Sequence, residues 1–156
     1  MTSKFGTITI ATLGLAALET LGLYGVADAF EPPKAPCSVL TPQEVAAAIG
    51  ANSGARQIVS TLCEWDASGH PGKFTLGFLS ASAWEQTKAM RERIKGFERT
   101  PISGLGEEAV FSTNGMISTL QVKKGSAVLD MHLYGIAPDN AKGKEVILAK
   151  AALGRF

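Results

Sequence analysis

Three polar side chains near the end of the sequence have the types and spacing needed for acid–base chemistry. Asp130, His132 and Tyr134 alternate with apolar residues, and on a β-strand this alternation places all three on one face. An aspartate can orient an imidazole that acts as a general base, and a tyrosine beside it can donate a proton. Side chains two residues apart on a strand stand about 7 Å from each other, so a direct hydrogen bond between Asp130 and His132 requires a favourable lean.

No sequence motif supplies the nucleophile that a hydrolase would need. The chain contains neither G-x-S-x-G nor S-x-x-K, the patterns that place a catalytic serine. The simplest interpretation of the three residues is the polar outer face of a sheet. A ligand or partner surface is the next interpretation, and it would include Thr119, Gln121 and Lys123 on the neighbouring strand. Catalysis centred on Asp130 and His132 is the remaining alternative.

The N-terminal segment has the three parts of a secretory signal. Residues 1–29 contain a basic residue, an apolar stretch and the small-residue pattern Ala27-Asp28-Ala29. Glu19 interrupts the apolar stretch, which argues against a membrane-spanning helix of about 20 apolar residues. We expect cleavage after Ala29, an extended leader over 30–36 and a single domain over 37–156, located in the periplasm or outside the cell. The alternative is that residues 1–29 are kept as an anchor.

The two cysteines, Cys37 and Cys63, indicate a structural disulfide. Exported proteins meet an oxidising compartment, where such a pair is normally bonded. A redox pair would normally be a C-x-x-C motif, which is absent. A metal site needs more ligands than the cysteines, His70 and His132 offer at any standard spacing. We therefore expect a disulfide, no metal and no other cofactor.

Charge argues against a nucleic-acid partner. The 156 residues carry a formal net charge of +1, whereas nucleic-acid binding relies on clustered lysine and arginine that neutralise phosphates. The densest basic stretch lies over 88–95, and its charges suit the solvated side of a helix.

The pattern of apolar residues predicts an α+β fold. The capping box of Thr41 and Glu44 marks a helix start, and Asn114-Gly115 is a strong hairpin signal. Residues 99–101 are expected to be a linker. Helices are predicted over 41–49, from 82 onward and over 138–153, and strands over 57–66, 73–80, 108–113, 116–123 and 127–134. The order α-β-β-α-β-β-β-α favours a single antiparallel sheet covered by helices.

Three segments together resemble a family of small exported bacterial domains, known best as actinobacterial lipoproteins of unknown function. The segments are Pro36 to Val45, which contains C-x-x-L-T-x-x-E-V, then Cys63-Glu64-Trp65, and Gly104-Leu105-Gly106-Glu107-Glu108-Ala109. The resemblance covers most of residues 36–153. It implies a Cys37–Cys63 disulfide and an α/β sandwich like that of photosystem-accessory and nuclear-import accessory domains. It brings no catalytic residues, and the missing lipobox departs from the family pattern.

These observations favour a noncatalytic binding or accessory module. A protein partner or a small apolar ligand would bind either the sheet face around Asp130 or the cleft between the sheet and the second helix. The alternative is a small hydrolase or proton-transfer enzyme that uses Asp130 and His132. An enzyme should hold these side chains in a concave pocket, whereas a partner surface should be flat.

Overall fold

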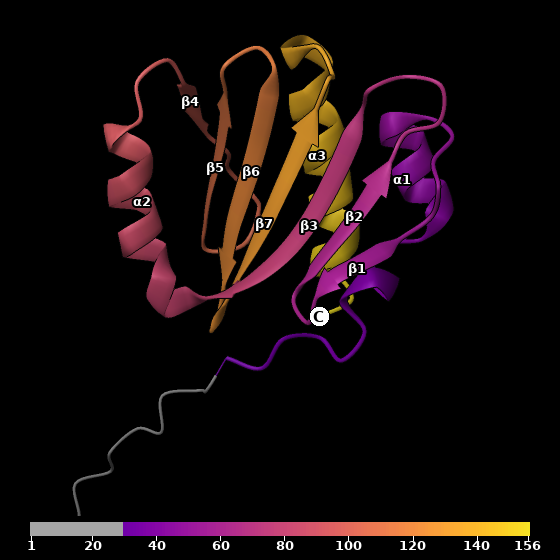
Figure 1. The fold of residues 1–156 in the computed structure, drawn as a ribbon. Helices are drawn as coiled ribbons and strands as arrows, with labels where there is room; N and C mark the ends of the chain where they lie inside the picture. The colour runs from indigo at the N-terminus through magenta and orange to yellow at the C-terminus, as the bar shows by residue number, and fades with distance from the viewer. Residues whose placement is uncertain (1–29) are drawn as a thin grey trace, which may run out of the picture.

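Seven strands form one open antiparallel sheet in the computed structural model of the chain, which describes residues 30–156 (Figure 1). The predicted signal peptide over 1–29 lies outside the described residues. The strands lie in the order β1-β2-β3-β7-β6-β5-β4 across the sheet. Their bounds are β1 Arg56–Val59, β2 Leu62–Asp66, β3 Lys73–Ser80, β4 Glu98–Pro101, β5 Glu108–Thr113, β6 Ile117–Lys124 and β7 Ala127–Tyr134.

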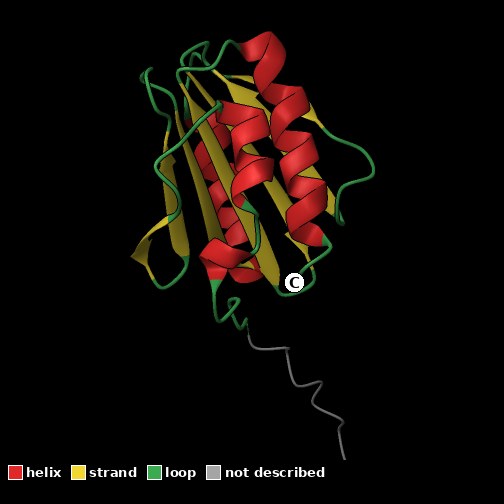
Figure 2. Cartoon of the chain, turned by 90° about the vertical axis from the view of Figure 1, so that its right-hand side faces the viewer, coloured by secondary structure: helices red, strands yellow, loops and turns green. Residues whose placement is uncertain are grey.

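Three α-helices cover the sheet from both sides. Helices α1 (Pro42–Ile49) and α3 (Pro138–Leu153) pack against each other, and α3 lies on β6 and β7. Figure 2 shows these two helices side by side over one face. Helix α2 (Trp84–Arg93) lies over the other face, beside β4 and β5 (Figure 1). Two short 3-10 turns, Pro36–Ser38 and Ala81–Ala83, precede α1 and α2.

The predicted α+β class with a single antiparallel sheet is confirmed, but the predicted element order is wrong in detail. The expected strand over 57–66 is two strands, β1 and β2, joined by a turn at Ser60 and Thr61. All four residues of β1 are exposed, so no alternation of burial marked it in the sequence. The expected linker over 99–101 belongs to β4, an edge strand in which Pro101 is tolerated because its missing N–H need not face another strand.

The second helix begins later than the sequence suggested. The hydroxyl of Ser80 accepts a hydrogen bond from the backbone N–H of Ser82 and so caps the 3-10 turn, after which α2 starts at Trp84. The helix ends at Arg93 because Ile94 adopts an extended conformation. The chain then continues past Phe97 into β4, and this segment stays close to the second face of the sheet.

The main hydrophobic core lies between the sheet and the pair α1 and α3. In register across four strands, Leu76, Met131, Leu120 and Phe111 point into it, and all are buried. Burying such side chains is the dominant stabilising contribution in a domain of this size. The opposite face of the same strands points away from this core.

The predicted disulfide is present. Cys37, in the first 3-10 turn, is bonded to Cys63 of β2, and their Cα atoms are 5.4 Å apart. Cys63 is fully buried in the core. The bond therefore ties the start of the domain to the sheet before α1 begins.

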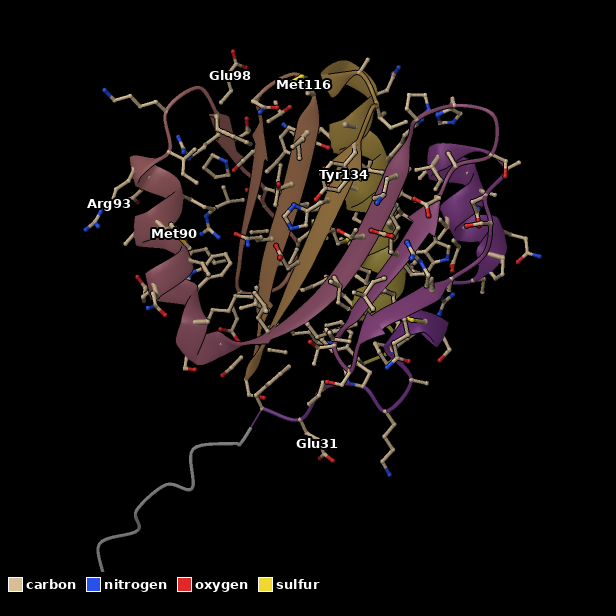
Figure 3. The ribbon with its side chains drawn as sticks, in the orientation of Figure 1. Glu31, Met90, Arg93, Glu98, Met116 and Tyr134 are labelled. Atoms are coloured by element: carbon tan, nitrogen blue, oxygen red, sulfur yellow. A yellow bond between two sulfur atoms is a disulfide. The ribbon has the colours of Figure 1, made fainter. Side chains whose placement is uncertain are left out.

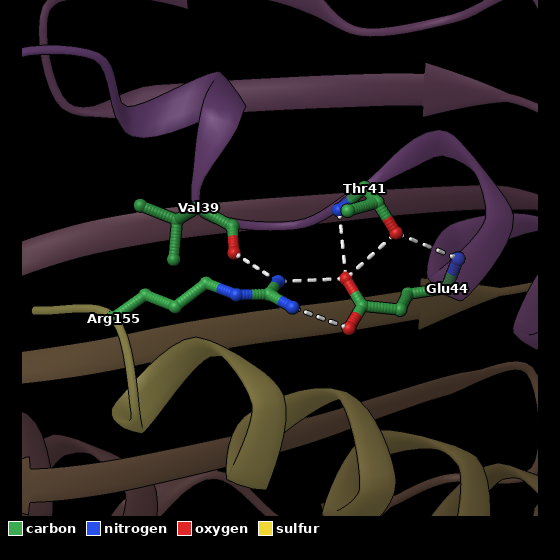
Figure 4. Close-up of polar contacts among 4 residues, drawn as sticks. All are labelled: Val39, Thr41, Glu44 and Arg155. Carbon is green, nitrogen blue, oxygen red and sulfur yellow. Dashed lines mark hydrogen bonds and ion pairs between the residues drawn. The ribbon is translucent and has the colours of Figure 1, made fainter.

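The predicted capping box is also present at the start of α1 (Figure 4). The Glu44 N–H donates to Thr41 Oγ1 at 3.3 Å, and the Thr41 N–H donates to Glu44 Oε2 at 2.7 Å. Two otherwise unpaired backbone donors are satisfied in this way.

Over residues 30–156, no helix combines the length and apolar character needed to span a membrane.

Candidate functional site

The second face of the sheet carries the polar residues singled out in the sequence. On β7, Asp130 and His132 lie directly opposite Gln121 and Thr119 of β6. Tyr134 continues the same face one step further along β7. The strand register thus brings residues from two hairpin-connected strands into one cluster, as their alternation indicated.

A cavity of about 390 Å³ lies between this cluster and α2. Asp130, His132, Tyr134, Thr119 and Gln121 all line it. Lys123 also lies on β6, but it does not line the cavity and instead pairs with Glu107 at 3.3 Å. The site face is therefore concave beneath α2, and five of the six predicted residues contribute to it.

The wall opposite the sheet comes from α2 and the segment that follows it. Met90, Ile94 and Phe97 line the cavity together with Leu79 and Ile117 from the sheet, so most of its surface is apolar. Met90 and Ile94 are nevertheless 58% and 46% exposed. These two lining side chains therefore lie where the cavity meets solvent, and Figure 3 shows Met90 on α2. These apolar side chains of α2 and of the segment after it therefore line the cavity rather than the main core.

A chain of hydrogen bonds crosses the floor of the cavity. Gln121 Nε2 donates to Asp130 Oδ1 at 2.7 Å, and Asp130 Oδ2 lies 3.1 Å from His132 Nε2. On its other side, His132 Nδ1 lies 3.2 Å from Thr119 Oγ1. The Asp130 and His132 side chains lean together, so the separation of about 7 Å between parallel side chains does not keep them apart.

This series of hydrogen bonds determines which ring nitrogen of neutral His132 carries the proton. An ionised carboxylate only accepts hydrogen bonds, so His132 Nε2 carries the ring proton and Nδ1 accepts from the Thr119 hydroxyl. The ring of Tyr134 stacks on the imidazole with centroids 6.2 Å apart. Burial raises the pKa of the Tyr134 phenol, which therefore keeps its proton near neutral pH.

Arg91 is a charged site residue that the sequence did not indicate. It lines the cavity, although the basic stretch over 88–95 suggested a solvated position for its charges. Its guanidinium lies 4.7 Å from the centre of the Trp84 ring, a cation–π arrangement. Its position seven residues after Trp84 and four after Thr87 places all three on one helix face, and this spacing was the available signal.

The terminal nitrogens of Arg91 are buried and have no hydrogen-bond partner within residues 30–156. Burial lowers the pKa of the guanidinium from its usual value, but an arginine side chain keeps its charge in proteins. Leaving a buried donor unsatisfied costs about 1–3 kcal/mol, and more when the group is charged. Arg91 thus places at the cavity wall a cation whose terminal nitrogens form no hydrogen bond within residues 30–156.

Arg99 lines the same cavity but is fully engaged by the backbone. Its Nη1 donates to the Phe97 carbonyl at 3.1 Å, and its Nη2 donates to the carbonyl of Ile94 at 2.7 Å and to that of Arg91. The carbonyls of Arg91 and Ile94 lie at the end of α2, and that of Phe97 lies in the segment that follows it. Arg99 therefore holds the segment that closes one end of the cavity.

Glu108 of β5 fixes the start of α2. The indole Nε1 of Trp84 donates to Glu108 Oε2 at 2.9 Å, and Lys88 Nζ donates to Glu108 Oε1 at 3.1 Å. Both hydrogen bonds and the Lys88 charge lower the pKa of Glu108. Helix α2 is thus attached to the sheet at its first turns and at its end, with the cavity between the two attachments.

Two further polar atoms at the cavity lack partners. Gln121 Oε1 and Ser112 Oγ are buried, and no hydrogen bond to either is formed by the described residues. Together with Arg91 they provide donors and an acceptor on a mainly apolar surface, the arrangement usual in pockets for small ligands. Residues 30–156 contain no group of three or more His, Cys, Asp or Glu side chains positioned to hold a metal ion.

Comparison of the chain with protein-family models, with curated proteins and with solved structures gave no match. Its function is therefore argued from the geometry of the cavity.

Proposed function

We propose that this chain is a noncatalytic, exported binding module that holds a small, largely apolar ligand between α2 and the sheet. The observation that carries the proposal is the cavity of about 390 Å³, whose walls are mainly apolar and whose few polar groups converge from β6, β7 and α2. Ligand pockets in proteins have volumes of about 300–1,000 Å³ and this same composition.

The concave shape favours a small ligand over a protein partner on the same face. A partner would need a broad accessible surface, with about 800 Å² buried on each side in a standard interface. Here α2 covers part of the polar cluster, and the side chains of Asp130 and His132 are only 19% and 29% exposed. A small molecule entering past Met90 and Ile94 can contact them directly.

The position of the polar cluster supports a noncatalytic role. Thr119, His132 and Asp130 lie in the interior of β6 and β7, each of which pairs with a strand on both sides. The backbone N–H groups around them are used in the sheet, so they are not free to stabilise an oxyanion. The amide nitrogen of Gln121 is likewise engaged by Asp130.

Export is part of the same proposal. The Cys37–Cys63 bond is typical of an oxidising compartment, and the first 29 residues have the composition of a secretory signal. The resemblance to exported bacterial domains of the lipoprotein type agrees with this assignment. Intact mass of the protein recovered from its own host tests it: we expect a chain that starts at Phe30 and is alkylated at two cysteines only after reduction. A mass that includes residues 1–29 would instead indicate a retained anchor.

Binding of N-phenyl-1-naphthylamine, an uncharged apolar fluorophore, tests the proposed cavity. Thr87→Trp fills the cavity from α2, whereas Ala89→Trp places the same side chain on the exposed side of the same helix. We expect saturable binding to the wild type and to Ala89→Trp, and at least about tenfold weaker binding to Thr87→Trp. Absence of saturable binding to the wild type, or equal binding to both variants, would overturn the proposal.

A hydrolase is the second candidate, favoured by the position of Asp130 and His132 in a concave cavity and by one further observation. Thr119, His132 and Asp130 form a continuous chain of contacts at 3.2 and 3.1 Å, the order of groups that activates a hydroxyl nucleophile. Hydrolysis of p-nitrophenyl butyrate separates the two candidates. Turnover above the buffer rate that is lost in both Thr119→Val and His132→Ala would favour the hydrolase, and turnover equal to the buffer rate would favour the binding module.

A further inference from the structure

We infer that the ligand of this cavity carries a carboxylate, which Arg91 binds, at the end of its apolar body. The inference rests on the proposed binding function and names the chemical class of the ligand. It is carried by the unpartnered guanidinium of Arg91, by the engagement of the Asp130 and Glu108 carboxylates with other side chains, and by the charge balance of the cavity.

The Arg91 guanidinium is held in place but not satisfied. It lies over the Trp84 ring at 4.7 Å, while Nη1 and Nη2 are buried without a partner among residues 30–156. A guanidinium presents these donors in a planar fork that matches a carboxylate. Arg155 of the same protein shows the satisfied form, with Nη1 and Nη2 donating to the two oxygens of Glu44 at 2.7 and 2.8 Å.

Two carboxylates near Arg91, those of Asp130 and Glu108, already form hydrogen bonds with other side chains. Asp130 also lines the cavity, but its oxygens contact Gln121 and His132. Glu108 lies beneath the start of α2, and its oxygens accept from Trp84 and Lys88. Neither forms a hydrogen bond with Arg91, so residues 30–156 supply no partner for its fork, and a ligand in the cavity can supply one.

The formal net charge of the residues that line the cavity is +1, which one negative charge on a ligand would neutralise. Arg91 and Arg99 are the cations among the lining residues and Asp130 is the anion, which leaves an excess of one positive charge. A carboxylate supplies one negative charge, whereas a phosphate monoester supplies about 1.5 to 2 near neutral pH. The remaining lining is apolar and accommodates an alkyl chain or ring rather than a second charged group.

The apolar and polar parts of the cavity are arranged for such a molecule. Arg91 and the unpartnered Gln121 Oε1 and Ser112 Oγ lie between α2 and the sheet, and Met90 and Ile94 flank the mouth. A medium-chain carboxylate can place its head on Arg91 and keep its chain against the apolar walls. Gln121 Oε1 is a hydrogen-bond acceptor without a partner among the described residues. A hydroxyl on the ligand that donates to it would add to the affinity.

Decanoate and 1-decanol form the matched pair of probes, since they differ only in the head group. Displacement of N-phenyl-1-naphthylamine from the wild-type protein at pH 8 gives both affinities. We expect decanoate to bind at least about tenfold more tightly than 1-decanol, as a charge-assisted, partly desolvated pair requires. This comparison needs no substitution and does not depend on the folding of a variant.

Arg91→Met and Arg93→Met provide the matched variants. Both remove one positive charge from α2, but Arg93 is exposed and does not line the cavity (Figure 3). We expect the preference for decanoate to fall to about one in Arg91→Met and to persist in Arg93→Met. Arg91→Lys should keep only part of the preference, because an ammonium is not a planar fork.

The outcomes separate this inference from the function on which it rests. If neither probe displaces the fluorophore, both the binding function and the carboxylate assignment are wrong. If 1-decanol binds as tightly as decanoate, or if Arg91→Met and Arg93→Met keep the same preference, the cavity binds apolar ligands and only the carboxylate assignment is overturned.

Discussion

Arg155 and Glu44, which are 111 residues apart in the sequence, form a two-pronged ion pair. Arg155 Nη1 also donates to the Val39 carbonyl at 2.8 Å, so the end of the chain is tied to the segment that enters α1 (Figure 4). Glu44 is at the same time half of the capping box of α1. The two termini of the domain are thus joined through one carboxylate.

Arg155→Met should lower stability and change its dependence on acid. The hydrogen bond from Arg155, followed by that from the Thr41 backbone, lowers the pKa of Glu44 from 4.5 to about 2. A carboxylate whose pKa is lower in the folded state stabilises the fold above its unfolded pKa, and this stability is lost as the pH falls toward the folded value. We expect a lower urea midpoint at pH 7 and a smaller loss between pH 4.5 and 2 than in the wild type. An unchanged acid profile would contradict the role of the pair.

Glu145→Gln should stabilise the protein at alkaline pH. Glu145 lies on α3, is fully buried, and has no hydrogen-bond partner for either carboxyl oxygen among the described residues. Burial raises its pKa from 4.5 to about 8. The carboxyl therefore loses its proton at a lower pH in the unfolded chain than in the folded protein. Its contribution makes the free energy of unfolding fall as the pH rises from about 4.5 to 8, with no further change above that.

Urea unfolding of the wild type and Glu145→Gln between pH 4.5 and 9 measures this effect. We expect similar unfolding free energies near pH 4.5 and an advantage for the variant on the order of 4 kcal/mol at pH 8. Glu85→Gln, an exposed carboxylate on α2, is the control and should run parallel to the wild type. Parallel curves for Glu145→Gln would show that the buried carboxyl is ionised or hydrated in the folded protein.

Loss of the disulfide should weaken the fold without changing it. The bond joins residues 26 apart, and closing a loop of that length stabilises by about 3.5 kcal/mol through the unfolded chain. The double variant Cys37→Ala, Cys63→Ala should lose about this amount in urea unfolding at pH 7. Reduced wild type should give the same value as the variant, and a loss below about 1 kcal/mol would contradict the expectation.

Arg99→Met should loosen the end of α2 and weaken ligand binding. The side chain donates to the carbonyls of Arg91, Ile94 and Phe97, and within residues 30–156 no other side chain forms a hydrogen bond with them. We expect amide hydrogen exchange over 91–97 to become about tenfold faster while the core strands are unaffected. Binding of N-phenyl-1-naphthylamine should weaken in parallel. Arg93→Met, which removes a charge from the last turn but no such bond, should leave both measurements unchanged.

Local signals in the sequence predicted most of the elements that carry the site. The strands β5, β6 and β7 lie within one residue of their expected bounds because each is rich in apolar and β-branched residues and turn residues such as Asn114-Gly115 separate them. The turn itself is held by Asn114 Oδ1, which accepts from the backbone N–H groups of Met116 and Ile117. Alternation also placed Asp130, His132 and Tyr134 on one face, since it depends only on the geometry of a single strand.

The edge strands and the cavity could not be obtained in this way. All residues of β1 and β4 are exposed, so their pairing leaves no pattern in the sequence. The burial of Arg91 and Glu145 was missed because helical charges normally face water. Whether each side chain is buried depends on which side of its helix the rest of the chain covers.

The sequence by itself determined the local elements, the disulfide partners and the two faces of each central strand, because these follow from residue type and spacing. The tertiary structure decided how α2 lies across the second face. That arrangement is set by contacts between residues far apart in the chain, such as Trp84 with Glu108 and Arg99 with the end of α2. The cavity, and the position of the Arg91 guanidinium within it, exist only once those contacts have formed.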